Sequence, residues 1–71
     1  MDRRTSIANA VRGARSEAGM SQKEVAAALG KSVDTVGNWE SGASSIPFDQ
    51  IIAMSELFRM PVDRFVGRKT A

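Results

Sequence analysis

The sequence predicts an all-α fold, a compact five-helix bundle, from three observations. Apolar residues recur at steps of three and four along most of the chain, which is the spacing of one helical face. Glycines and serines stand where helices would end and begin, so the connections are short. No segment alternates apolar and polar residues as a strand does. We therefore expect one domain over residues 1–71, with a basic N-terminal arm at 1–4, a helical core over about 5–67 and a basic tail at 68–71.

The first helix is predicted to begin near Thr5 or Ser6. Gly19 is placed to end it in the left-handed conformation, which glycine adopts without steric cost. One face of this helix carries apolar residues at steps of four, three and four: Ile7, Val11, Ala14 and Ala18.

The second helix is predicted over residues 22–29. Ser21 and Glu24 have the spacing of a capping box. In this motif the serine hydroxyl accepts a hydrogen bond from the glutamate amide, and the glutamate carboxylate accepts one from the serine amide. Gly30 is the next left-handed stop. The inward residues of this helix are predicted to be Val25, Ala26 and Leu29.

The third helix is predicted from Val33 to about Ser41, with Ser32 as its N-cap and Gly42 as its end. Helical spacing directs one set of residues inward, namely Val36, Trp39 and Glu40. It directs another set outward, and that set is mostly small and polar: Val33, Asp34, Gly37, Asn38 and Ser41.

A fourth helix is predicted with Pro47 in its first turn. It is apolar on most sides, and we expect it to be the central core element: Phe48, Ile51, Ile52, Met54, Leu57 and Phe58. Pro61 is predicted to begin a short fifth helix with the apolar residues Val62, Phe65 and Val66.

The composition excludes several classes of protein. The chain has neither Cys nor His, so it holds no disulfide and lacks the usual zinc ligands. Without His, Cys or Tyr, and without a glycine-rich phosphate loop, few catalytic constellations are available. We therefore expect a protein that is not an enzyme and that uses no metal or cofactor. The sequence contains no apolar run long enough for a membrane span, and its first residues lack the apolar stretch of a signal peptide, so we also expect the protein in the cytoplasm.

The net charge of +2 conceals a segregation along the chain. Residues 1–31 sum to +3 and residues 59–71 again to +3, whereas residues 32–58 sum to −4 and contain no Lys or Arg. Basic flanks suit a nucleic-acid backbone, while the acidic middle segment favours a protein partner. The charge pattern alone therefore leaves both kinds of partner open.

The segment from Met20 to Gly30, MSQKEVAAALG, followed by Ser32, Val36, Trp39-Glu40 and Gly42, resembles the repressor and Cro type of helix-turn-helix domain. This type occurs in phage repressors and in XRE-like bacterial regulators. Pro47, Ile51, Phe58 and the segment Pro61–Phe65 look like the family's fourth and fifth helices, so the resemblance spans about residues 5–67. It implies a lambda-repressor-like fold whose second and third helices bind DNA. It also implies an ion pair between Arg15 and Glu40, against the alternative of two solvated side chains.

On this resemblance the third helix enters the major groove, which is about 12 Å wide. The residues predicted to face the bases are Val33, Asp34, Thr35, Gly37 and Asn38. Asn38 is able to read adenine, and Asp34 is able to accept from cytosine. The alternatives are that Asn38 is only solvated and that Asp34 only stabilises the dipole of the helix. Contacts to the DNA backbone are predicted for Arg12, Ser21, Gln22, Lys23, Lys31, Ser32, Ser41, Ser44 and Ser45, with Arg3 and Arg4 in the arm.

The function that these features predict is a sequence-specific DNA-binding regulator of transcription, a repressor that binds an inverted-repeat operator as a homodimer. The natural dimer surface is near the C-terminus, at Met60, Phe65 and Val66, although core packing is an equal alternative for each. The alternative function is an antitoxin or adaptor that binds a protein partner through the acidic third helix. Such a regulator would be associated with the nucleoid when bound to DNA.

Overall fold

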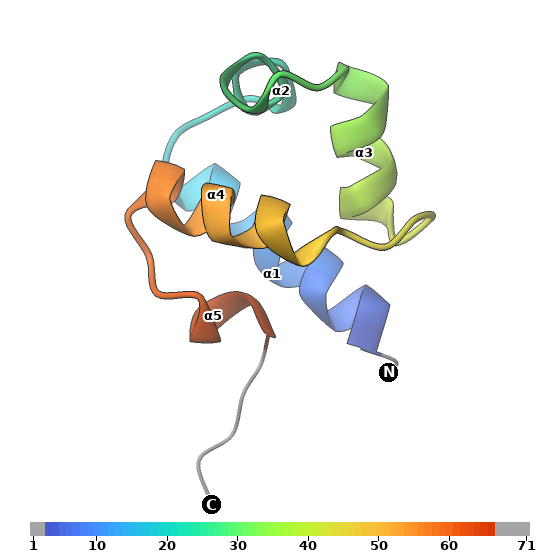
Figure 1. Ribbon diagram of the computed structural model, residues 1–71, viewed down its shortest axis with the longest axis vertical. Coiled ribbons are helices and arrows are strands. Elements are labelled where there is room, and N and C mark those ends of the chain that lie inside the picture. The colour runs from blue at the N-terminus through green and yellow to red at the C-terminus, as the bar shows by residue number, and fades with distance from the viewer. Residues whose placement is uncertain (1–2, 67–71) are drawn as a thin grey trace, which may run out of the picture.

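The computed structural model describes residues 3–66, and over this range it contains five helices and no strand (Figure 1). The predicted all-α fold is therefore confirmed. The helices are α1 (Arg3–Glu17), α2 (Gln22–Leu29), α3 (Val33–Ser41), α4 (Phe48–Phe58) and α5 (Asp63–Val66).

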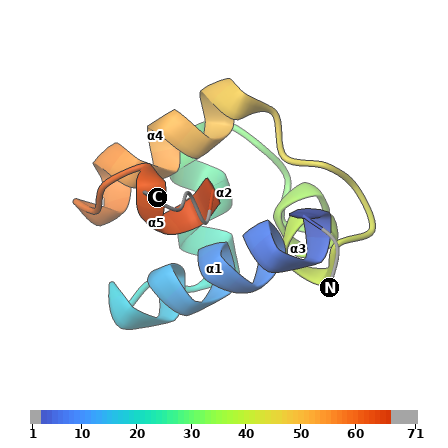
Figure 2. The same ribbon diagram turned by 90° about the horizontal axis from the view of Figure 1, so that it is seen from below.

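The helices surround one core, and helices distant in the sequence lie side by side. In Figure 1, α4 crosses in front of α1, while α2 and α3 form one end of the molecule. Figure 2 shows α5 beside both α1 and α4. The rings of Phe58 on α4 and Phe65 on α5 are 6.3 Å apart at a tilt of 52°. This tilted arrangement is favourable for two aromatic rings and fixes the short α5 against α4.

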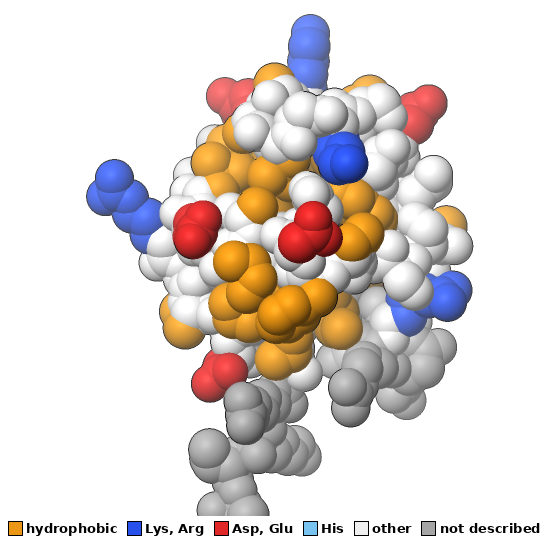
Figure 3. Space-filling view, viewed as in Figure 1, with side chains coloured by type: hydrophobic (Ala, Val, Ile, Leu, Met, Phe, Trp, Pro, Cys, Tyr) orange, Lys and Arg blue, Asp and Glu red, His pale blue; other side chains and the backbone are white. Residues whose placement is uncertain are grey.

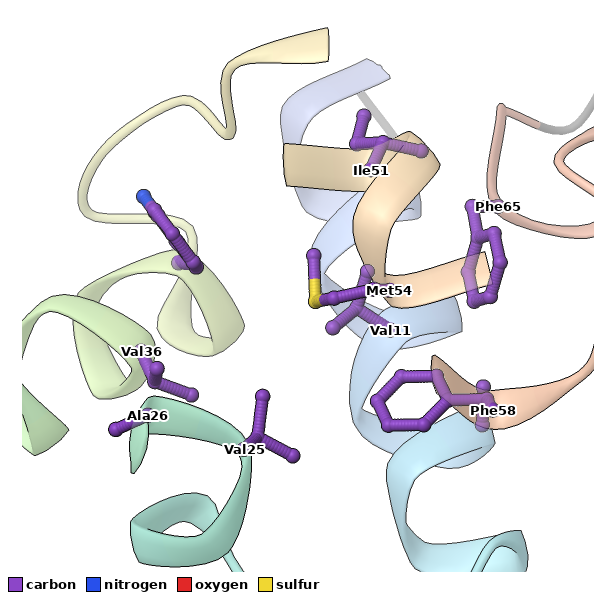
Figure 4. Packing of buried hydrophobic residues seen from close by; sticks show 10 residues of the cluster. Val11, Val25, Ala26, Val36, Ile51, Met54, Phe58 and Phe65 are labelled. Carbon is purple, nitrogen blue, oxygen red and sulfur yellow. The ribbon is translucent and has the colours of Figure 1, made fainter. Parts of the chain in front are cut away.

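The buried core draws side chains from all five helices (Figure 4). Its members are Val11, Ala14, Val25, Ala26, Val36, Trp39, Ile51, Met54, Phe58 and Phe65. One expectation for α1 is wrong in detail, because Ala18 is exposed; Ala8, which the predicted face did not include, is buried. Ala18 lies beyond the last residue of α1, so the helical spacing that predicted its burial no longer applies there.

The caps of α2 and α3 confirm the bounds predicted for these helices. The Ser21 hydroxyl accepts from the Glu24 amide at 3.0 Å, and the Glu24 carboxylate accepts from the Ser21 amide at 2.8 Å. At the other end, Gly30 has a φ of 69° and its amide points at carbonyls of the last turn. Both ends of α2 are thereby fixed, and α3 is capped in the same way by Ser32, whose hydroxyl accepts from the Thr35 amide, and by Gly42.

Three other helix ends differ from the predictions. α1 begins at Arg3, so Arg3 and Arg4 form its first turn and do not belong to an extended arm. Arginine is a good helix former, so the helix extends past Thr5 and Ser6, where it was expected to begin. Pro47 is the N-cap of α4 and lies just outside its first turn. α5 begins at Asp63, since Pro61 and Val62 form the preceding turn, in which the Arg64 amide bonds to the Pro61 carbonyl.

An ion pair on the surface connects α5 to α1. The two terminal guanidinium nitrogens of Arg64 donate to the carboxylate of Glu17. Nη1 donates to Oε2 at 3.2 Å, and Nη2 donates to Oε1. The hydrogen bonds from Arg64, and then its positive charge, hold the pKa of Glu17 below its usual range. In turn, the hydrogen bonds to Glu17 and its negative charge raise the pKa of Arg64. Because both side chains are exposed, the pair orients α5 more than it stabilises the fold.

We predict that the Glu17 carboxyl titrates at a lower pH in the wild-type protein than in an Arg64→Gln variant. A carboxyl whose pKa is depressed by folding stabilises the fold above its unfolded pKa, and this contribution is lost as the pH falls through the folded pKa. Carboxyl carbon shifts of Glu17, followed by NMR between pH 2 and 7, measure both values. Equal pKa values in the two proteins would show that the ion pair is absent in solution.

Candidate nucleic-acid interface

A buried ion pair determines how α3 lies against α1. Arg15 Nε donates to Glu40 Oε2 at 2.6 Å, and Arg15 Nη2 donates to Glu40 Oε1 at 3.0 Å. The Glu40 side chain is only 3% exposed and that of Arg15 is 17% exposed. The structure thus contains the predicted pair, in the two-pronged geometry that makes an arginine–carboxylate contact strong and directional.

The same two residues also hold α2 and the turn before it. Arg15 Nη1 donates to the Met20 carbonyl at 2.7 Å, which anchors the segment between α1 and α2. Gln22, the first residue of α2, donates from Nε2 to Glu40 Oε1 at 3.1 Å. One carboxylate therefore connects three helices. Sequence reasoning placed Gln22 only at the DNA backbone and did not foresee this bond, because it joins residues distant in sequence.

The outward face of α3 is free of other helices at three predicted positions. Val33 is 46% exposed, and Asp34 and Asn38 are also exposed. The other two predicted base-facing residues, Thr35 and Gly37, are half-buried. A Cβ on Gly37 would lie 3.8 Å from Gln22 Oε1, so this position faces the start of α2. The structure therefore divides the predicted set into an exposed group and a group at the α2–α3 junction.

The N-termini of α2 and α3 both present free amides. In α2, the capping box uses the amides of Ser21 and Glu24, which leaves those of Gln22 and Lys23 outside it. In α3, Ser32 Oγ accepts from the Thr35 amide at 3.1 Å. Amides at a helix N-terminus attract anions, because they add a partial positive charge to their donor capacity.

The serines predicted to contact the DNA backbone are all exposed, but two of their hydroxyls act in the caps of α3. Ser32 Oγ also lies 2.9 Å from Thr35 Oγ1. Ser41 Oγ donates to the Asn38 carbonyl at 3.2 Å and accepts from the Ala43 amide at 3.3 Å. Ser44 and Ser45 follow in the loop to α4. The predicted cations Arg12, Lys23 and Lys31 are exposed, and Arg12 donates to Asn9 Oδ1 at 3.1 Å.

The predicted dimer surface near the C-terminus requires a correction. Phe65 is 1% exposed and belongs to the core, so its ring faces Phe58 and not a partner. For Phe65 the alternative of core packing is therefore the correct one, because α5 folds back on α1 and α4 and buries it. Met60 and Val66 are half-buried and pack against the core cluster.

Two other features are absent from the described residues, a cluster of metal ligands and a membrane-spanning helix. Among residues 3–66, no three His, Cys, Asp or Glu side chains gather in a way suited to a metal ion. None of the helices in this range combines the length and the apolar character needed to cross a bilayer.

Comparison with known proteins gives one match. Residues 11–65 match the model of a helix-turn-helix family, which covers the core, the α2–α3 unit and all but the last residue of α5. Neither a curated protein nor a solved structure shows a significant match. The matched range contains every residue of the ion-pair network and of the outward α3 face.

We predict that Glu40→Ala lowers the free energy of unfolding by about 3–5 kcal/mol, because Arg15 is left partly buried without its partner. Urea unfolding followed by the fluorescence of the single tryptophan, the buried Trp39, measures this change. Glu56→Ala is the control, since Glu56 is exposed on α4 and its loss should cost under about 0.5 kcal/mol. Similar midpoints for the two variants would contradict the assignment.

Proposed function

Because the chain belongs to the helix-turn-helix family, as a Cro/CI-type DNA-binding regulator of transcription, we propose that it is a repressor that binds an inverted-repeat operator as a dimer. The observation that carries the proposal is the α2–α3 unit itself. Its outward face is exposed at Val33, Asp34 and Asn38, and its orientation is fixed by a buried carboxylate. A short helix held in this manner fits the major groove of B-DNA.

Base recognition falls to the outward face of α3. The Asn38 amide matches adenine, which offers an acceptor at N7 and a donor at N6. Asp34 accepts from the cytosine amino group, and Val33 packs on a thymine methyl group. Gly37 presents no side chain at the α2–α3 junction, which allows the backbone of α3 to come close to the DNA.

Contacts to phosphates fall to the start of α2 and to the cations and serines around the unit. The free amides of Gln22 and Lys23 suit one phosphate, and the side chains of Lys23 and Lys31 add charge. The loop after α3 contributes Ser44 and Ser45 but no cation. Fewer cations at the DNA release fewer counterions, so we expect a shallow dependence of affinity on salt.

A single α3 reads too few base pairs to select one site in a genome. A dimer with two-fold symmetry reads two half-sites about 34 Å apart, one turn of the double helix. Occupancy of such an operator would block access of the polymerase to a promoter. The proposed mechanism is therefore steric and needs no cofactor.

Selection of binding sites from random duplex DNA tests this function, and we expect an enriched inverted repeat. Asn38→Ala should then lose the preference for one base at one position in both half-sites, at a cost of about 1–3 kcal/mol per contact. Glu56→Ala, on α4, is the control and should select the wild-type site.

Two outcomes would contradict the proposal. The first is binding that is equal for all sequences, or no enriched repeat, which would favour the antitoxin or adaptor function suggested by the acidic segment 32–58. The second is a uniform loss of affinity in Asn38→Ala, which would mean that Asn38 only positions the helix.

We predict that Gly37→Ala has opposite effects on stability and on DNA binding. A Cβ at this position meets only Gln22 Oε1, at an ordinary contact distance of 3.8 Å, and alanine favours a helix by about 1 kcal/mol over glycine. The fold should therefore become more stable, while the added methyl group keeps the backbone of α3 from the DNA. Gly13→Ala is a matched control in α1 with open space around its Cβ, and it should stabilise the fold without changing affinity. Equal affinities for both variants would contradict the close approach.

A further inference from the structure

A hollow lies between the start of α1 and the loop that precedes α4. It has a volume of about 260 Å³ and is lined by Arg4, Ile7, Ser45 and Ile46. Small-molecule sites usually begin at about 300 Å³, whereas an apolar cavity of about 150 Å³ accommodates benzene. The hollow is therefore suited to one large apolar side chain, with a cation and a hydroxyl at its rim.

An exposed phenylalanine lies beside this hollow. Phe48 is the first residue of α4 and is 62% exposed, and the only other exposed large apolar side chain among those described is Val33. Only Pro47 separates Phe48 from Ile46 in the wall of the hollow, so their backbones lie within about 7 Å of each other. In Figure 3, apolar side chains gather along the lower edge of α4 in the view. Val33 belongs to the α3 face proposed to contact DNA, whereas Phe48 is not part of the core cluster and has no proposed contact within the monomer.

The charges on the two sides of this surface are complementary. Arg4 stands at the rim of the hollow, and Asp49 follows Phe48 directly. Both residues are exposed, and in the part of the chain that the structure describes neither takes part in an ion pair. A phenylalanine that enters such a hollow from another molecule brings an aspartate towards the arginine.

We propose that a second copy of this chain covers the surface, with Phe48 of each copy inserted into the hollow of the other. Asp49 of each copy then pairs with Arg4 of the other. When a two-fold axis passes between a projection and a hollow that lie side by side on one molecule, the projection of each copy faces the hollow of the other copy. Both contacts occur twice in the resulting dimer.

The site is compatible with the DNA-binding face. The hollow lies at the C-terminal end of α3, where Thr5 Oγ1 comes within 3.9 Å of a Cβ placed on Gly42. The base-facing side chains of α3 are not part of it. Arg4 and Ser45, which the sequence predicted at the DNA backbone, do line the hollow. The proposed dimer assigns these two residues to the partner copy and leaves the phosphate contacts to the other predicted residues. The inference supplies a surface for the dimer assumed in the proposed function, and it is tested without DNA so that its failure leaves DNA binding itself unaffected.

Sedimentation equilibrium of the purified chain tests the role of Phe48. The surface is small, so we expect a dissociation constant on the order of 10–100 μM for the wild-type dimer. Phe48→Ser removes two buried rings per dimer and should weaken it about 100-fold. Val33→Ser is the matched control, since it removes the other exposed apolar side chain and should leave the constant unchanged. Circular dichroism confirms that each variant is folded.

Charge reversal tests the pairing between copies. Arg4→Glu places two repulsive pairs in its own dimer, and Asp49→Arg does the same. A mixed dimer of these two variants has one native pair and one reversed pair, both attractive. We therefore expect the 1:1 mixture to associate at least about tenfold more tightly than either variant alone. Lys31→Glu and Asp34→Lys, an exposed basic residue and an acidic residue in a first turn, form the control mixture and should show no gain.

Three results would overturn the inference. One is a wild-type chain that is monomeric at millimolar concentration. Another is Phe48→Ser that dimerises as the wild type does, which would place the interface elsewhere, for example at Met60 and Val66. The third is an Arg4→Glu and Asp49→Arg mixture that gains nothing over its components, which would show that these charges do not meet across the dimer.

Discussion

The structure depends on the ion pair between Arg15 and Glu40. Glu40 is almost fully enclosed, and a buried carboxylate without a partner would cost several kcal/mol. Because Arg15 meets both of its oxygens, α3 can neither rotate nor slide along α1 without breaking a charged contact. The bonds to Met20 and Gln22 extend the same constraint to α2 and its preceding turn. The orientation of the exposed face of α3 is therefore determined by Glu40, whose charged side chain lies on the opposite, inward side of the same helix.

This constraint links stability to recognition through Gln22. The Nε2 of Gln22 is bound to Glu40, and its Oε1 faces Gly37 on the adjacent turn of α3. A glycine in the middle of a nine-residue helix weakens that helix by about 1 kcal/mol. The packing around Gly37 leaves room for a methyl group, so the core does not require glycine here. The proposed approach of DNA to the α3 backbone would account for a residue that the fold alone does not favour.

The parts of the fold that were predictable from sequence are those with local signals. The caps at Ser21 and Ser32 and the stop at Gly30 act over a few residues, so α2 and α3 have the predicted bounds. α4 instead ends at Phe58, and the next residue, Arg59, has a φ of 59° without being glycine, so nothing in its type marks that end. Burial also depends on distant segments. Phe65 lies in the core because α5 folds back, and the hollow at Arg4 and Ile46 joins segments about 40 residues apart.

The acidic middle segment is the strongest objection to DNA binding, and the fold weakens it. Residues 32–58 contain four acids and no cation, yet these acids do not face one surface. Glu40 is buried and neutralised by Arg15, while Asp49 and Glu56 lie on α4. Only Asp34 remains on the outward face of α3, where a single carboxylate is able to accept from a cytosine. Of the acids in residues 32–58, the surface that the proposed complex presents to DNA therefore carries one, beside the helix N-termini, Lys23 and Lys31, and the repulsion of phosphates by this segment is far smaller than its sum of −4 implies.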